Sequence, residues 1–177
     1  MALWVFGYGS LLWNPGFTPV RKVKARLPDY HRSFCMLSIH HRGSEDDPGL
    51  VLALDTQPGG QCTGAAFQVA ESEEDRVLTY LRERELISSA YYEDHVDLHT
   101  DEGETIRALA YIINRDHVQY CQFALEKQAQ MIANAIGGRG PNTEYLYNTA
   151  VHLAEMGIRD PDMEWLVERV RALKATR

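Results

Sequence analysis

The stretch Val5-Phe6-Gly7-Tyr8-Gly9-Ser10-Leu11-Leu12 decides how the first half of this chain is interpreted. Its apolar residues predict a short buried strand over residues 3–8, which the Gly-x-Gly-Ser turn ends. Glycine lets the backbone approach another group closely, and successive N–H groups in such a turn can bind a carboxylate or carbonyl oxygen. A tight turn without a ligand explains these residues equally well. The stretch lacks the third glycine of a dinucleotide-binding fingerprint and the Gly-Lys-Ser/Thr of a Walker loop.

The rest of the first half also predicts strands. They cover residues 30–39, 50–54 and 62–69, with Leu27-Pro28-Asp29 and Pro58-Gly59-Gly60 as turns and Gly64 as a bulge. Residues 40–49 hold two glycines, one proline and three acidic residues. This composition predicts a loop with little packing of its own, which becomes ordered when a substrate binds.

Helices dominate the second half. Ser72 is the predicted N-cap of a first helix that ends before Ser88, and two strands, 92–98 and 106–113, follow it. Three more helices are predicted: 118–136; 142–156, with Asn142 or Thr143 as cap and Gly157 at its end; and 161–175, capped by Asp160. Strands first and helices last indicate an α+β protein, and we expect a single domain over residues 1–177.

Composition excludes several classes of protein. The chain has 177 residues, 45% of them apolar and 24% charged, as in ordinary soluble globular proteins. Its net charge of −7 argues against a nucleic-acid partner, and no apolar run approaches the roughly 20 residues of a membrane span. The three cysteines, Cys35, Cys62 and Cys121, form no C-x-x-C pair and are expected to be reduced thiols. With no signal-peptide pattern at the N-terminus, we expect a cytoplasmic protein.

The first helix carries two carboxylates that face in different directions. Glu85 falls on the same stripe as Val77 and Leu81, whereas Glu83 lies about 200° around the helix from Leu81. An inward carboxylate is costly unless it is paired, and desolvation shifts its pKa toward the range of a general base. An ion pair with a buried arginine is the alternative role for Glu85, and from the helix alone it is the better-supported one.

Two further patterns carry less information. The glycine-rich run Gly137–Asn142 precedes a helix start and can bind an anion with the help of Arg139, but an ordinary connector explains it better. The histidine pairs His40-His41 and His95 with His99 lack a third ligand nearby, so we expect no metal site.

Four segments taken together are specific. Val5–Leu11, His41-Arg42-Gly43, Arg84-Glu85 with the following Tyr91, and Asn142-Thr143-Glu144-Tyr145-Leu146 resemble the ChaC-type glutathione-specific γ-glutamylcyclotransferases. The resemblance runs from about residue 3 to residue 157 and implies a γ-glutamylcyclotransferase-like fold, a small mixed β-barrel flanked by helices. Two departures are present: Ser89-Ala90 replaces a frequent Gly-Gly before the tyrosine, and the Arg-Glu pair is repeated. Counting from Tyr91 back selects Glu85, in agreement with the helical face.

The resemblance also implies a reaction and its residues. Glutathione would be cleaved to 5-oxoproline and cysteinylglycine by attack of the substrate's own α-amine on its side-chain carbonyl, with Glu85 as general acid and base and no cofactor. Substrate binding is expected from Val5, Phe6, Gly7, Tyr8, Gly9, Ser10, Leu11, Arg42 and Tyr145, and either Arg42 or Arg139 is a candidate for the glycine carboxylate.

Two alternatives remain open. The same reaction can act on other γ-glutamyl amino acids or amines, because specificity depends on the pocket beyond the γ-glutamyl group. A catalytically silent regulatory or binding protein on the same fold is the second alternative. An unpaired inward Glu85 argues against it, since a binding module gains nothing from such a carboxylate.

Overall fold

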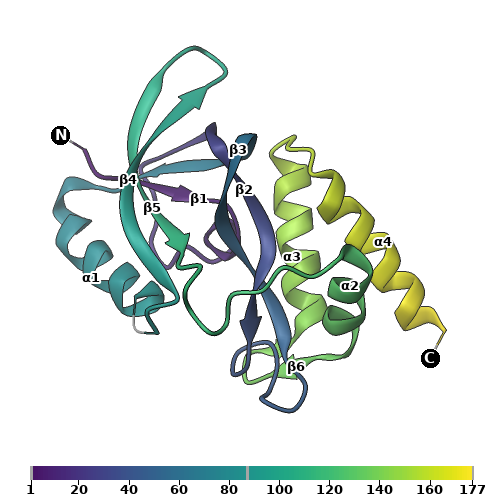
Figure 1. Ribbon diagram of the computed structural model, residues 1–177. Coiled ribbons are helices and arrows are strands. Elements are labelled where there is room, and N and C mark those ends of the chain that lie inside the picture. Colours follow the sequence, from purple (N-terminus) through teal and green to yellow (C-terminus); the bar gives the residue numbers. More distant parts are fainter. Residues whose placement is uncertain (1, 87, 177) are drawn as a thin grey trace. The chain divides into compact units, whose positions relative to one another are not determined.

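The computed structural model describes residues 2–86 and 88–176 (Figure 1). The elements follow in this order: β1 (Trp4–Gly7), the 3-10 helix η1 (Ser10–Leu12), β2 (Arg21–Ser38), β3 (Gly49–Gln68), the 3-10 helix η2 (Glu71–Glu73), α1 (Glu74–Glu85), β4 (Tyr91–Thr100), β5 (Thr105–Ile113), α2 (Leu125–Asn134), β6 (Ile136–Gly137), β7 (Gly140–Pro141), α3 (Asn142–Glu155) and α4 (Pro161–Ala175). Among the described residues, no helix is long and apolar enough to cross a membrane.

The chain divides into two compact units that alternate along the sequence. The first comprises Met1–Arg32 and Leu54–Val118, and the second comprises Ser33–Ala53 and Gln119–Arg177. The long strands β2 and β3 each contribute residues to both units. The single domain expected over residues 1–177 stays a prediction.

Five strands close into a barrel in the order β1-β3-β2-β4-β5. The barrel is mixed, because β1 pairs antiparallel with β3 but parallel with β5, where Val5 lies opposite Leu109. The predicted α+β class and small mixed barrel are therefore confirmed.

Alternation along β1 distributes its side chains over two apolar clusters. Phe6 packs with barrel residues such as Leu54 and Ile112, whereas Val5 packs in the other cluster. The second cluster also holds Val77 and Leu81 of α1, both fully buried, so α1 covers this side of β1 and β5 (Figure 1). Burial of these side chains positions the C-terminal end of α1. The predicted Ser72 cap is wrong: Glu73 precedes the helix, and no side chain caps it.

Two predicted turns are wrong, because the strands bend there without ending. Residues 27–29 lie inside β2 and residues 58–60 lie inside β3. Asp29 and Gly59 both have positive φ, 66° and 79°, and the Gly59 N–H donates to Asp29 Oδ1 at 2.9 Å. A proline or glycine in a strand therefore marks a bend here. Gly64 is required by a close approach, since an added Cβ would lie 2.3 Å from the Gly7 carbonyl oxygen.

In the second unit, α2, α3 and α4 pack against one another (Figure 1). As predicted, Asp160 caps α4 through the Met163 N–H, and Gly157, at φ 71°, follows the end of α3. α2 begins at Leu125, later than predicted. Residues 115–119 form turns, Tyr120 forms an isolated β-bridge with Met36, and the N–H of Cys121 donates to the Cys35 carbonyl at 2.8 Å.

The loop at residues 40–49 is better fixed than its composition predicts. The N–H of Arg42 donates to Ser38 Oγ, and the N–H groups of Gly138 and Arg139 donate to the carbonyls of His40 and His41. An added Cβ on Gly137 would lie 2.4 Å from the backbone of His41. The expectation of little packing is therefore wrong for residues 40–43.

Asn142 does not cap α3 as predicted, and neither does Thr143, because Pro141 precedes the helix without a side-chain cap. The Asn142 side chain is fully buried and acts as a strand partner for β3. Its Oδ1 accepts the Leu50 N–H at 2.8 Å, and its Nδ2 donates to the Leu50 carbonyl at 2.8 Å. Two buried backbone groups thus depend on one side-chain amide.

Asn142→Ala should lower the free energy of unfolding by about 2 kcal/mol or more, because it leaves the Leu50 N–H and carbonyl without this partner. Urea denaturation at pH 7 measures the loss. Asn134→Ala is the control, because the Asn134 amide is exposed and donates within its own helix. Equal stabilities of the two variants would contradict the structural role of Asn142.

Candidate active site

The turn after β1 is formed almost entirely from buried residues. Val5 to Gly9 and Leu11 are buried, and the Tyr8 hydroxyl donates to the Tyr111 carbonyl at 3.0 Å. Ser10 is half-buried and begins η1, whose first hydrogen bond runs from the Leu12 N–H to the Gly9 carbonyl at 2.9 Å. Of the predicted binding residues Val5–Leu11, Ser10 is therefore the one whose side chain reaches the surface of this unit.

Arg32 holds the backbone of this turn from β2. Its guanidinium donates to the Tyr8 carbonyl at 2.5 Å and to the Thr63 carbonyl. Gly7 allows the same close packing, since an added Cβ would lie 2.5 Å from the Phe67 ring. The backbone at Tyr8-Gly9 is thus fixed before any ligand arrives. Sequence analysis missed Arg32, because nothing in the sequence pairs it with the turn.

The two carboxylates of α1 face as the helical spacing predicts. Glu83 is exposed, whereas the Glu85 side chain is 16% exposed. The Arg84 Nε lies 3.4 Å from Glu85 Oε1, so Glu85 is not unpaired. The Glu85 carboxylate therefore gives no reason to exclude a silent binding protein.

Arg84 connects Glu85 to the turn. Its Nη2 donates to Ser10 Oγ at 2.8 Å, and its Nη1 donates to the Tyr80 hydroxyl and to the Asn14 carbonyl. Ser10 and Glu85, which are 75 positions apart in the sequence, thus share one guanidinium. A hydroxyl donor and a carboxylate proton acceptor side by side suit acid–base chemistry on a carbonyl compound.

A second carboxylate, Glu93, lies on β4 opposite Tyr111 of β5. Arg82 donates two hydrogen bonds of 3.0 Å to Glu93, and the Tyr111 hydroxyl donates a third, also of 3.0 Å. The Arg82 guanidinium holds the pKa of Glu93 below its usual range. Burial raises the pKa of the Tyr111 hydroxyl, and the charges of Glu93 and Glu85 raise it further, so Tyr111 stays protonated. The sequence does not predict that Glu93 and Tyr111 lie opposite each other, because this depends on the register in which β4 pairs with β5.

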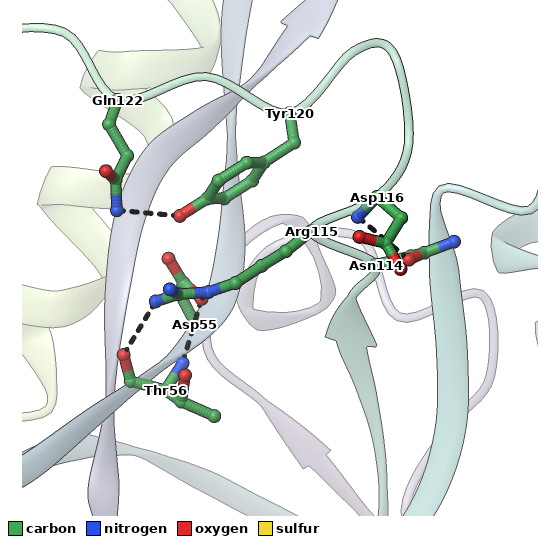
Figure 2. A network of polar contacts seen from close by, with 7 residues as sticks. All are labelled: Asp55, Thr56, Asn114, Arg115, Asp116, Tyr120 and Gln122. Atoms are coloured by element: carbon green, nitrogen blue, oxygen red, sulfur yellow. Dashed lines mark hydrogen bonds and ion pairs between the residues drawn. The ribbon is translucent and has the colours of Figure 1, made fainter.

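A buried carboxylate elsewhere in the first unit has a structural task. Asp55 is 2% exposed, and its Oδ1 accepts hydrogen bonds from Arg115 Nε at 2.7 Å and from the Thr56 N–H at 2.9 Å (Figure 2). Arg115 also donates to the Thr56 carbonyl at 3.1 Å. These bonds attach the segment after β5 to β3, and we assign Asp55 no catalytic role.

The other predicted binding residues lie together in the second unit. The Arg42 side chain is 7% exposed; its Nη1 donates to the Pro141 carbonyl at 3.1 Å and lies 3.5 Å from Glu144 Oε1. The Arg42 guanidinium lies 5.9 Å from the centre of the Tyr145 ring, and the Tyr145 hydroxyl accepts the Leu52 N–H at 3.1 Å. Arg139, the other candidate for a substrate carboxylate, is exposed.

Metal and thiol chemistry find no support in the described part of the chain. No group of three His, Cys, Asp or Glu side chains within residues 2–86 and 88–176 is arranged to hold a metal ion. The three cysteines are buried, and burial raises the pKa of Cys121 to about 11. A buried, protonated thiol is a poor nucleophile.

Comparison with known proteins identifies the family of this chain. The model of the family described as ChaC-like protein matches residues 3–173. The chain belongs to this family. A relative from Escherichia coli (strain K12), named glutathione-specific gamma-glutamylcyclotransferase, is 34% identical over 98% of this chain and 74% of its own length. A relative from Danio rerio, named glutathione-specific gamma-glutamylcyclotransferase 1, is 35% identical over 92% of this chain and 83% of its own length.

Solved structures show the same fold. The crystal structure of a yeast gamma-glutamylcyclotransferase specific to glutathione superposes with a TM-score of 0.89, covering 99% of this chain and 98% of the yeast chain at 21% identity. A second structure, titled gamma-glutamyl cyclotransferase, has a TM-score of 0.61 at 18% identity and covers both chains completely. At these identities the agreement concerns the fold.

Glu93→Gln should destabilise the protein at pH 7, and its stability difference from the wild type should shrink in acid. The pKa of Glu93 is lower in the folded state than its unfolded value of about 4.3. Its stabilisation is therefore complete above about pH 4.3 and disappears as the pH falls through the depressed folded pKa. Urea denaturation between pH 7 and pH 3 measures this. Asp97→Asn, which breaks an exposed ion pair of the same strand, is the control; a difference independent of pH would contradict the account.

Proposed function

We propose that this chain cleaves glutathione to 5-oxoproline and cysteinylglycine. The observation that carries the proposal is the shared Arg84 guanidinium, which keeps the Glu85 carboxylate and the Ser10 hydroxyl together. The names of the family's relatives support glutathione as the substrate. Cleavage of other γ-glutamyl amino acids or amines remains the second candidate, because it needs the same acid–base groups.

The reaction needs no protein nucleophile. Glu85 accepts a proton from the substrate's α-ammonium group, and the free amine attacks the γ-carbonyl carbon, forming the C–N bond of a five-membered lactam. The amide C–N bond to the cysteinyl residue then breaks as Glu85 returns the proton to the departing nitrogen, and the lactam nitrogen loses its second proton to the released amine. One carboxylate thus acts first as base and then as acid.

The turn after β1 would stabilise the oxyanion. The Ser10 hydroxyl and the N–H groups of the turn are hydrogen-bond donors of the kind that stabilises a developing oxyanion. Arg32 and the packing around Gly7 fix this backbone in advance, which avoids reorganisation during the reaction. Val5, Phe6, Tyr8 and Leu11 would contribute by fixing the turn, since their side chains are buried.

Arg42 and Arg139 are the two candidates for binding the glycine carboxylate of glutathione. The Arg42 guanidinium already contacts Glu144 and the Pro141 carbonyl, so binding a substrate carboxylate requires competition with Glu144. Arg139 is exposed, and its charge adds to the effect of burial, which lowers the pKa of His41. Arg139 is therefore the better candidate of the two for the glycine carboxylate, and substrate binding by Arg42 and Tyr145 stays a prediction.

Glu85→Gln should lower kcat for 5-oxoproline formation from glutathione by at least about 10²-fold, because the amide cannot accept the proton. Glu83→Gln is the matched control on the exposed face of the same helix and should leave kcat and thermal stability unchanged within error. Both variants are assayed with glutathione and with γ-glutamylalanine, and thermal unfolding confirms that they are folded.

Wild-type protein that releases 5-oxoproline from γ-glutamylalanine alone would support the second candidate. Wild-type protein inactive on both substrates would support a silent binding protein. A folded, active Glu85→Gln variant, or an inactive Glu83→Gln variant, would overturn the assignment of the base.

A further inference from the structure

The guanidinium of Arg84 is nearly enclosed by its partners. The side chain is 12% exposed and donates to the Ser10 hydroxyl, the Tyr80 hydroxyl and the Asn14 carbonyl, while its Nε faces Glu85. These partners come from the turn after β1, the following loop and α1. The planar fork of an arginine can serve several acceptors in fixed directions, which the single ammonium of a lysine cannot do.

The contact between Arg84 and Glu85 is not a product of helix geometry. Consecutive residues on a helix point about 100° apart and do not face each other. Their side chains nevertheless approach to 3.4 Å, while the same guanidinium reaches Ser10 of the turn after β1. Glu83, the carboxylate on the other side of Arg84 in the sequence, is exposed. The guanidinium therefore selects one of the two neighbouring carboxylates.

The same guanidinium decides how the Ser10 hydroxyl can act. Because Nη2 donates to Oγ, the Ser10 oxygen serves as acceptor and its hydrogen can turn toward another group. A hydroxyl that accepts a charge-assisted hydrogen bond is polarised and becomes a stronger donor. The loop is fixed further by Gly16, at φ 80°, where an added Cβ would lie 2.3 Å from the Tyr80 ring. The contact with Arg84 of α1 thus leaves the Ser10 hydroxyl hydrogen available for donation.

We propose that Arg84 is a positioning residue of the site: it directs the Ser10 hydroxyl as a hydrogen-bond donor to the substrate and holds the Glu85 carboxylate beside it. This inference rests on the proposed cyclotransferase function. Arg84 itself does not exchange a proton with the substrate.

A double-mutant cycle between Arg84→Lys and Ser10→Ala tests this role, with 5-oxoproline formation from glutathione as the readout. Arg84→Lys should lower kcat by roughly 10-fold or more, with a smaller change in KM, because the donor is displaced while the charge is kept. Ser10→Ala should lower kcat as well. The double variant should lose clearly less than the product of the two single losses, because part of the effect of Arg84 acts through Ser10. Arg76→Lys, an exposed arginine of the same helix, is the control and should keep wild-type kcat.

Chemical rescue adds a readout that a purely structural role would not move. Guanidinium ion, added at a concentration that leaves the wild type folded, should restore part of the kcat of Arg84→Ala and none of that of Ser10→Ala. Independent losses that multiply in the double variant, an unchanged kcat in Arg84→Lys, or no Arg84 variant that folds would each overturn the positioning role. A wild type inactive on glutathione would instead overturn the proposed function, and this inference with it.

Discussion

The site depends on one ion-paired, hydrogen-bonded guanidinium, that of Arg84. It joins the turn after β1 to the last turn of α1 and brings Ser10 and Glu85 together from distant parts of the sequence. A carboxylate in a half-buried position is costly unless charged or polar partners compensate it, and Arg84 supplies that compensation without enclosing Glu85 completely. The apolar cluster of Val5, Val77 and Leu81 keeps the helix in place, so the geometry does not rely on the polar contacts alone.

This arrangement explains why so few protein groups are needed for the proposed chemistry. The substrate carries both the nucleophile and the electrophile, so the protein has to fold the substrate, move one proton and stabilise one oxyanion. The Arg82–Glu93–Tyr111 group lies beside the site and has a different task, because its carboxylate is fully engaged by two arginine nitrogens and a phenol. Glu85 and Glu93 thus have different roles in the same unit because their hydrogen-bonding partners differ.

Much of the fold was predictable from the sequence, and the failures have physical causes. Helix-end signals identified α3 and α4, because Gly157 follows the end of α3 and Asp160 caps α4. Pro28 and Gly59 predict turns, but β2 and β3 bend there without ending. The local sequence predicts Asn142 as a helix cap. Its side chain instead forms hydrogen bonds with the Leu50 backbone, which is distant in the sequence.

For the site, the sequence predicted the face of Glu85 and the importance of the turn, since both follow from local spacing. The ion pair of Glu85 with a buried arginine was the alternative that the helix alone favoured, but the sequence did not identify Arg84 as that arginine. It also did not predict that Arg84 would bind Ser10 or that Arg32 would hold the Tyr8 carbonyl, since these contacts depend on tertiary structure. The assignment of Arg42 from its motif also gave no indication that its guanidinium would be occupied by Glu144.

The central claim is that the substrate's own amine, and not water, attacks the γ-carbonyl while the protein supplies proton transfer and positioning. Turnover of glutathione in water enriched in ¹⁸O, with mass analysis of the products, tests it most directly. The account predicts 5-oxoproline without ¹⁸O, and no turnover of glutathione whose α-amine is acetylated. Glutamate carrying one ¹⁸O, or cleavage of the acetylated substrate, would contradict it.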